Sequence, residues 1–354
     1  MLRKTKYISV MPNRQSGSTL KKSILFNLAL PLLALPAYAE VNPLAPSNAP
    51  VVQINTVNMS NHLFAAVGQH LRNGDLANKA TMPVSSVMHG MSLWGSGYYG
   101  QAKLDDRSHS KGIEPESMGG IVAIDKKLTP HMKMGIGYQY DNTDIDGYKR
   151  KTDTDTNTGF IYAEYQPNAM FVNGIVSYGR STLKGKNFAL KDSIRGKYHA
   201  DLWGMQGLTG YKFSTHMLDM TPQMGLRYNY IKRHGYNDGA EQQISGKNMD
   251  IFTGVLGLAL SKDLYWHECL KLRPEVYGGL TYDFISDRDK AVVWTSQGER
   301  YVIDGKRLNK IGYQIGAGIT SELTERLSFN IGYLGNFRKN FHDNSGIMGL
   351  SYAM

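Results

Sequence analysis

The sequence predicts an all-β protein, a transmembrane antiparallel β-barrel of about 12 strands preceded by a short N-terminal helix. The first observation is an alternation of side chains. In the stretch KLRPEVYGGLTYDF, residues 271–284, ionic and apolar residues occupy opposite parities, so a strand there has one ionic face and one apolar, aromatic face. The second is that the connections between such stretches are alternately short and long, which is typical of barrels in the bacterial outer membrane. A soluble sandwich has no reason for that alternation.

Residues 1–39 are predicted to be a secretory signal peptide. Two lysines precede the apolar run 24–35, and an Ala-Tyr-Ala sequence precedes the predicted cut. The apolar run is too short to span a bilayer, which disfavours the alternative of a membrane anchor. The leader is longer than usual, so translation could start at Met1 or at Met11.

The formal charge of +10 does not indicate a nucleic-acid partner. Residues 1–39 hold six basic and no acidic side chains, and the rest of the chain has 34 basic against 30 acidic side chains. The excess of positive charge therefore belongs mostly to the leader. Cys269 is the only cysteine, so no disulfide can form within the chain.

A spacer and a helix are predicted between the leader and the first strand. Residues 40–57 are rich in Pro and Asn and are expected to be a flexible spacer. Residues 58–87 are expected to be a linker whose helix is capped by Ser60 or Asn61 and ends near Arg72. The apolar residues of this helix recur at helical spacing: Leu63, Phe64, Val67 and Leu71.

The barrel is predicted to occupy residues 88–354. Its strand-like stretches have a period of two and an even count, as a closed bacterial barrel requires. They cover residues 90–104, 117–128, 131–142, 157–166, 169–182, 200–213, 217–232, 249–261, 271–284, 309–323, 326–339 and 344–354.

Short connections such as Thr129-Pro130 alternate with long polar ones. Short turns are typical of the periplasmic rim and long loops of the extracellular rim, so both termini of the mature chain are expected to be periplasmic. The long connections are residues 105–116, 143–156, 183–199, 233–248 and 285–308.

The polar parity of each strand is predicted to face the lumen. Side chains of both charge signs occur there, which favours mutual pairing over a strongly ion-selective pore. The predicted lumen-lining residues are Lys133, Glu164, Arg227, Lys271, Arg273, Glu275 and Gln314.

Histidines and acids at strand ends offer weak evidence for catalysis or metal binding. His62 and His70 are eight positions apart, and the other histidines show no ligand spacing, so neither a metal nor another cofactor is predicted. A protease or lipase site at the outer rim is an alternative. Polar loops contain such residues by default, however, so the chain is predicted not to be an enzyme. The rim candidates are Asp105, Asp106, His109, His199, His234 and Asp238.

The predicted loop 183–199 carries a cluster of basic side chains. It could pair with the phosphates of lipopolysaccharide or with anions of a host surface. A loop that is merely soluble is the alternative. Its basic residues are Lys184, Lys186, Lys191, Arg195 and Lys197.

The stretch GGIVAIDKKLTPHMKMGIGYQY, residues 119–140, resembles the translocator β-domain of autotransporters, the type V secretion family. The resemblance lies in a Gly-rich apolar strand, the acidic and basic residues 125–127 before a tight turn, and the Gly-x-Gly-Tyr motif at 135–138. The stretches LWGSGYYG (93–100) and GFIYAEYQPNAMFVNGIVSYG (159–179) are also similar. The resemblance implies a twelve-stranded barrel preceded by a helix that threads the pore. It would give the segment from Ser60 to Arg72 this lumenal role, with Leu63, Phe64, Val67 and Leu71 as plug residues.

The sequence departs from the family pattern in two ways. Family members usually carry a long passenger before the barrel, whereas only residues 40–57 are available here. Some relatives are cut at an Asn-Asn pair in the helix, which this sequence lacks. The expected function is thus that of an integral outer-membrane translocator-type barrel without a sizeable passenger. The alternatives are a loop-displaying adhesin and a small-solute pore.

The end of the chain resembles the final strand of other outer-membrane barrels. In those strands a Gly is followed three and five positions later by aromatic or bulky apolar residues, and Gly349, Tyr352 and Met354 fill these places. The resemblance implies recognition by the barrel assembly machinery. The other expected partners are periplasmic chaperones, outer-membrane lipid and lipopolysaccharide, and the barrel is expected to be a monomer without nucleic acid.

Overall fold

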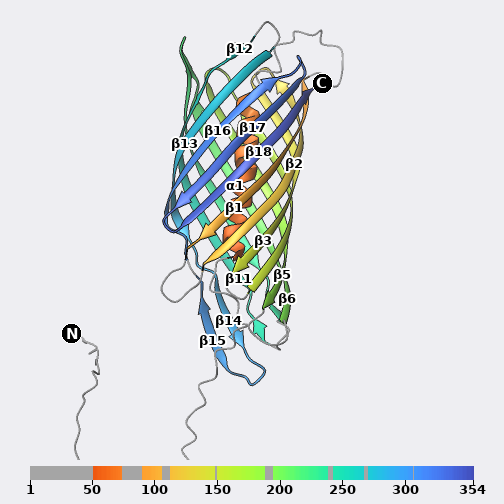
Figure 1. Ribbon diagram of the computed structural model, residues 1–354, viewed down its shortest axis with the longest axis vertical. Coiled ribbons are helices and arrows are strands. Elements are labelled where there is room, and N and C mark those ends of the chain that lie inside the picture. The colour runs from red at the N-terminus through yellow and green to blue at the C-terminus, as the bar shows by residue number, and fades with distance from the viewer. Residues whose placement is uncertain are drawn as a thin grey trace, which may run out of the picture. The chain divides into compact units, whose positions relative to one another are not determined.

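A computed structural model describes residues 51–73, 90–105, 112–147, 150–187, 194–237, 242–266, 270–305 and 307–354. Within these ranges, one helix lies inside a closed antiparallel barrel (Figure 1). The predicted signal peptide, residues 40–50 of the spacer, Lys191 and Cys269 lie outside the described residues, as do the rim candidates Asp106, His109 and Asp238.

Twelve strands form the barrel wall, which confirms the predicted fold class. Each strand pairs with its neighbours in the chain, β1 pairs with β18, and the pairing of β8 with β11 completes the ring. The wall strands are β1 Met91–Leu104, β2 Ile113–Thr129, β3 Met132–Gly147, β4 Arg150–Tyr165, β5 Met170–Asn187, β6 Ile194–Tyr211, β8 Asp219–Arg233, β11 Lys247–Ser261, β13 Leu270–Ser286, β16 Ile311–Glu322, β17 Leu327–Arg338 and β18 Phe341–Ala353.

Two of the predicted long loops are largely strand. β3 continues to Gly147 and β4 begins at Arg150, while β5 continues to Asn187 and β6 begins at Ile194. The alternation explains this difference. Thr154 and Thr156 are buried on the inner face, while Asp155 between them has the outward parity, so the hairpins continue beyond the apolar band.

The other two long connections that the structure describes form a small second sheet. Its strands are β9 Tyr236–Asn237, β10 Gln243–Ile244, β14 Lys290–Trp294 and β15 Arg300–Asp304. Ile244, Val293 and Ile303 are buried between its elements. The sheet lies at one end of the barrel, opposite the chain's C-terminus (Figure 1). Two short strands, β7 Phe213–Ser214 and β12 Leu264–Trp266, pair with wall strands at the other end.

The barrel has its apolar side chains outside and its polar ones inside. Met118, Ile136 and Met224 are each about 60% exposed on the outer face, whereas Gln139 and Thr143 are fully buried on the inner face. This arrangement is the reverse of a soluble core and suits a wall whose outer solvent is lipid. No helix among the described residues is long and apolar enough to cross a bilayer.

The helix α1 spans Val51–Asn73 and begins earlier than the sequence predicts. Residues 51–57, predicted to belong to the spacer, are helical and buried. Neither Ser60 nor Asn61 is a cap, since both lie within the helix. At about 1.5 Å per residue the helix is roughly 35 Å long, which exceeds the height of a barrel's apolar band, about 25 Å.

The direction of α1 follows from contacts at its two ends. Near its start, Gln53 donates a hydrogen bond to Ser286 at the long-loop end of β13 (3.4 Å). At its end, Asn73 donates to Thr320 at the short-turn end of β16 (2.8 Å). The C-terminal residue Met354 also lies at this end, where its amide donates to the carbonyl of Met91 (2.9 Å). The helix thus runs from the long-loop end to the end that holds the C-terminus.

Candidate functional site: the helix-filled lumen

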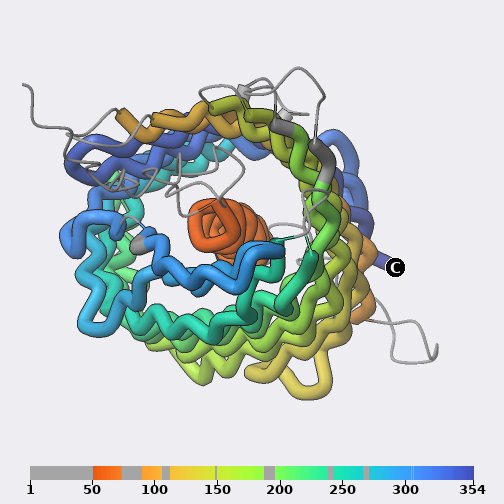
Figure 2. The backbone as a smooth tube through the Cα atoms, turned by 90° about the horizontal axis from the view of Figure 1, so that it is seen from below, coloured from red at the N-terminus to blue at the C-terminus, as the bar shows by residue number. Residues whose placement is uncertain are grey.

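The candidate site is the lumen itself, which α1 traverses (Figure 2). The helix is buried on all sides, including its polar residues, because the lumen wall supplies hydrogen-bond partners. Ser60 donates to Asn229 (2.9 Å), and the ring of His62 hydrogen-bonds to the hydroxyl of Ser345 (2.8 Å). Residues 58–62, in which Met59 is the only apolar side chain, can therefore remain helical inside the barrel.

An apolar collar surrounds the first turns of α1 at the long-loop end. Val51, Val52 and Ile54 pack there against side chains from almost every part of the wall. Each of these wall residues lies near a strand end, which explains why apolar side chains interrupt the otherwise polar inner face. The collar includes Leu104, Ile113, Ile145, Leu183, Ile231, Met249, Leu308 and Phe341.

The predicted plug residues lie in a second apolar cluster nearer the short-turn end. Leu63, Phe64, Val67 and Leu71 are all buried there, each at most 2% exposed. Their partners on the wall include an aromatic surface formed by Trp94 and Tyr98 of β1 and Phe160 and Tyr162 of β4. Tyr162 and Phe160 lie over glycines of β3, Gly135 and Gly137, whose missing side chains leave room for the rings.

A buried polar network joins the end of α1 to the aromatic surface. The ring of His70 stacks on Trp94, with 4.7 Å between ring centroids, and its Nε2 lies 2.5 Å from a carboxylate oxygen of Asp125. Tyr162 donates to the same carboxylate oxygen (2.6 Å) and accepts from the indole of Trp94 (2.7 Å). The network fixes the rotation of the helix, since it requires His70 to face β1 and β2.

Arg227 of β8 holds the middle of the helix. Its guanidinium donates to Asn61 of α1 and, at 2.7 and 3.0 Å, to Gln206 of β6. It also lies over the ring of Phe64, 4.9 Å from the centroid. These contacts satisfy a buried cation without a carboxylate partner.

Arg72 makes the ion pair between the helix and the opposite wall. Its guanidinium donates to both carboxylate oxygens of Glu275 on β13, at 2.7 to 3.2 Å. Both side chains are mostly buried. A bidentate pair of this kind fixes orientation as well as distance.

The other predicted lumen-lining residues face the lumen but pair on the wall. Lys133 lies opposite Glu164 in the register of β3 and β4, and Gln314 donates to Asn336 (2.8 Å). Near the short-turn end, Lys271 pairs with Asp263 and Glu322, and Arg273 donates to Ser261 (3.1 Å). Of the seven predicted residues, Arg227 and Glu275 are the two for which a hydrogen bond to the helix is described.

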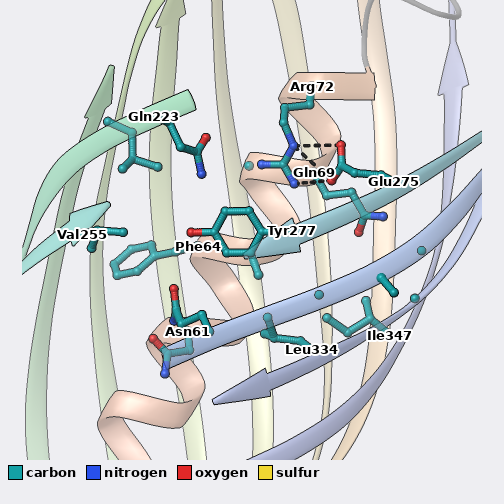
Figure 3. Close-up of a pocket in the computed structure, with 18 of the residues that line it drawn as sticks. Asn61, Phe64, Gln69, Arg72, Gln223, Val255, Glu275, Tyr277, Leu334 and Ile347 are labelled. Carbon is teal, nitrogen blue, oxygen red and sulfur yellow. Dashed lines mark hydrogen bonds and ion pairs between the residues drawn. The ribbon is translucent and has the colours of Figure 1, made fainter. Parts of the chain in front are cut away.

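A cavity of about 90 Å³ separates part of the helix from the wall (Figure 3). Phe64, Gln69 and Arg72 of α1 face it from one side, and Glu275 and Tyr277 of β13 face it from the other. Glycines of β16 and β17 form much of its outer lining: Gly316, Gly318 and Gly332. The larger void thus lies between the helix and the wall from β6 to β17, and a smaller one of about 40 Å³ lies near the end of the helix beside Ser92 and Trp94 of β1.

The residues considered for catalysis or metal binding do not converge on one site. His234 lies 2.7 Å from Asp201, and His199 hydrogen-bonds to Thr182, both on the outer face of the wall. His62 and His70 belong to separate contacts of the helix. Among the residues that the structure describes, no group of three potential ligands could hold a metal ion.

The predicted C-terminal residues occupy the strand that closes the barrel. β18 pairs with β1 along its whole length, including Tyr352 with Leu93. Tyr352 faces outward, whereas Gly349 faces the lumen, where an added side chain would meet Asn330.

Sequence reasoning missed the aromatic surface and the polar network. Trp94 and Tyr98 share the parity of the inner face of β1, which is a signal that could have placed them in the lumen. The pairing of His70 with Asp125 has no such local signal, because the two residues meet only when the helix enters the barrel.

These features define a class of protein, the outer-membrane β-barrel whose lumen is filled by a helix that precedes its first strand. A family model, "Autotransporter beta-domain", matches residues 93–334. The chain belongs to this family, which confirms the resemblance seen in the sequence.

Solved structures show the same fold. The translocator domain of the autotransporter NalP from Neisseria meningitidis covers 84% of this chain and 99% of its own, with 15% identity and a TM-score of 0.62. The β-domain of the Bordetella autotransporter BrkA covers 75% of this chain and 100% of its own, with 13% identity and a TM-score of 0.59. At these identities the likeness shows the fold alone.

Curated relatives are much longer than the matched region. Outer membrane protein A of Rickettsia rickettsii is 24% identical over 96% of this chain, which spans 16% of that protein. An extracellular serine protease of Serratia marcescens is 20% identical over 84% of this chain and 29% of its own length. Proteolysis is a property named for the Serratia protein, and the region shared with it is the barrel, a transport fold.

Proposed function

We propose that this chain is the translocator of an outer-membrane autotransporter system, held by α1 in a closed state, and that its barrel catalyses no reaction. The observation that carries the proposal is the path of α1. The helix enters at the long-loop end, fills the lumen and leaves beside the C-terminus. A polypeptide segment that precedes Val51 must therefore pass through the lumen to reach the long-loop end. This is the path that transport of a polypeptide through the barrel requires.

The closed state is tested by bilayer conductance. Deletion of residues 51–73 removes the helix and leaves the twelve wall strands intact, so conductance should rise severalfold while the barrel remains heat-modifiable. The matched control deletes residues 296–299 in the turn between β14 and β15, outside the lumen. If the helix deletion left conductance at the wild-type level, the helix would not be what closes the lumen, and the proposal would fail.

We also propose that the long-loop end is extracellular and the short-turn end periplasmic. The asymmetry of the two rims supports this orientation. Protease added to intact cells should cut within residues 287–309 and spare the turns at 130–131 and 323–326. Cleavage at these turns in intact cells would invert the orientation.

The partners are proposed on the same basis. A monomeric barrel reaches the membrane through periplasmic chaperones and an assembly machinery that reads β18, whose edge must also meet β1 to avoid unpaired backbone groups in lipid. Removal of residues 350–354 should therefore cause periplasmic degradation, and a normally assembled truncated barrel would refute this role. The expected absence of a sizeable passenger is tested by the intact mass of the protein from outer membranes, which should equal that of residues 40–354.

Two alternatives lack a specific supporting observation. A constitutive small-solute pore predicts large conductance in the presence of the helix. An adhesin predicts loss of surface binding when the long loops are trimmed.

A further inference from the structure

The outer surface of the barrel is strongly polarised in charge at its long-loop end. On β4–β6, five outward-facing basic residues stand against three carboxylates, of which Asp153 lies opposite Lys184 in the register of β4 and β5. The basic residues are Lys151, Arg180, Lys184, Lys186 and Lys197, and the acids are Asp153, Asp155 and Asp201. On β2 and β3 the corresponding surface carries only acids: Glu114, Glu116, Asp144 and Asp146. The basic surface is part of the wall, since Lys184, Lys186 and Lys197 lie in paired strands rather than in a loop.

Two pairs of lysines face each other directly across neighbouring strands. Lys184 of β5 lies opposite Lys197 of β6, and Lys186 of β5 lies opposite Lys151 of β4. Like charges in directly opposite positions destabilise a sheet. A sheet that keeps two such pairs side by side on its outer face is more stable when an anion lies between them.

The protein neutralises this surface only in part. Lys184 is 3.1 Å from Asp155, and Lys151 is 3.1 Å from Asp144. For Lys186 and Lys197 the described residues provide no carboxylate partner. Two ammonium groups are thus available to an external anion at the centre of the surface.

The height of the lysines above the apolar band indicates the kind of anion. Tyr178 and Trp203 face each other on the outer face of β5 and β6, with their rings 4.7 Å apart, and mark the membrane interface. Lys184 follows Tyr178 by six positions. At about 3.3 Å per residue and a strand tilt of about 45°, it stands roughly 15 Å above the aromatic pair. The headgroup layer of an ordinary bilayer is only about 5–8 Å thick on each side, so an anion at the level of Lys184 must belong to a lipid with a larger headgroup.

We propose that the outward-facing lysines Lys151, Lys184, Lys186 and Lys197 bind the phosphate groups of an outer-leaflet glycolipid, with Tyr178 and Trp203 placed at the boundary of its acyl region. Phosphate oxygens accept charge-assisted hydrogen bonds from several ammonium groups at once, which removes the repulsion within both lysine pairs. The proposal rests on the extracellular placement of the long-loop end. The proposal places the lipid on the side of the barrel formed by β4–β6. The acidic surface of β2 and β3 is not part of the lipid site.

The test uses the full chain in phosphatidylcholine nanodiscs, titrated with fluorescent lipopolysaccharide. The variant Lys184→Gln/Lys186→Gln/Lys197→Gln removes three of the four charges. Each basic side chain near an anionic surface contributes roughly fivefold in affinity, so binding should weaken by about 100-fold. The control Lys126→Gln/Lys127→Gln/Lys212→Gln makes the same charge change at the short-turn end and should bind as the wild type does. An equal loss in the control would overturn the proposal.

Two further arms keep the test decisive if the glutamine variant folds poorly. The three Lys→Arg substitutions retain the charge and should retain binding. Chemically dephosphorylated lipopolysaccharide should bind the wild-type protein weakly, with about the affinity of the glutamine variant for the intact lipid. Equal binding of the dephosphorylated lipid would refute a phosphate site, and inorganic phosphate competing as strongly as the glycolipid would refute a lipid site. A wrong orientation in the membrane would appear in the protease test on cells and not in nanodiscs.

Discussion

The two sides of the lumen hold the same helix by different means. On the side of β1–β4, aromatic rings pack against α1 and leave His70 in a buried network with Asp125. On the side of β13–β17, glycines line a cavity of about 90 Å³, and the ion pair of Arg72 with Glu275 crosses it. The aromatic side is a close-packed interface, whereas on the glycine side the helix is held by this ion pair and, at its two ends, by hydrogen bonds to Ser286 and Thr320. We infer that the first side supplies most of the free energy that keeps the helix in place.

The largest effect should come from removing the aromatic surface. The triple variant Trp94→Ala/Phe160→Ala/Tyr162→Ala removes three buried rings from the interface with α1. Burial of a ring of this size is worth about 3 kcal/mol or more. The helix should leave the lumen, and bilayer conductance should approach that of the variant without residues 51–73.

Tyr277→Ala is the matched control on the other side of the lumen. Its ring lines the cavity instead of a close-packed contact with the helix. Conductance should stay close to the wild-type level. If Tyr277→Ala opened the barrel as widely as the triple variant does, the two sides would hold the helix equally and the comparison would be wrong.

The strands of the wall could be predicted from the sequence because the alternation of side chains that defines each strand is a local pattern. Alternation along each stretch assigns the faces, so twelve strands and seven lumen-facing residues could be placed without knowing any partner. The sequence predicts loops where the hairpins extend, because the outward-facing residues there are charged and charged stretches are typical of loops. In 150–158, however, the inward threonines continue the strand pattern.

The first turns of the helix and its contacts were not predictable in the same way. Residues 51–57 follow a Pro-rich segment and were interpreted as spacer, but Val51 and Ile54 are buried by a collar whose members come from distant strands. Glu275 was placed in the lumen by its parity, whereas its partner Arg72 is 203 positions away. Such pairs form only after the helix and the barrel have come together.

A second prediction concerns glycines at equivalent places on the two sides. A side chain added at Gly137 would overlap the ring of Phe160 and come within 2.7 Å of the carbonyl oxygen of Val122, so a rigid ring or the backbone must move. Gly137→Ala should cost about 1–3 kcal/mol. The temperature at which the folded band is lost on electrophoresis should fall accordingly.

Gly316→Ala sharpens this result on the cavity side. The added carbon would meet Tyr277 at 3.4 Å and the carbonyl oxygen of Tyr333 at 3.5 Å, which are ordinary contacts. Its effect should stay within about 0.5 kcal/mol. A fall as large as that of Gly137→Ala would show that the glycine side is as tightly packed as the aromatic side.

Among the changes expected to weaken the hold on the helix, the smallest effect should come from the ion pair that crosses the cavity. Glu275→Gln keeps the shape of the side chain but leaves the cation of Arg72 without its carboxylate. Because both side chains keep some contact with solvent, we expect a loss of about 1 kcal/mol and not the larger cost of a fully buried pair. Conductance should then show brief openings that the wild type lacks, since the helix remains anchored by the aromatic side.

Glu322→Gln removes a carboxylate that pairs with Lys271 on the wall, and it should leave the openings as rare as in the wild type. Equal opening in both variants would mean that general loss of negative charge near the short-turn end, and not the contact with Arg72, loosens the helix.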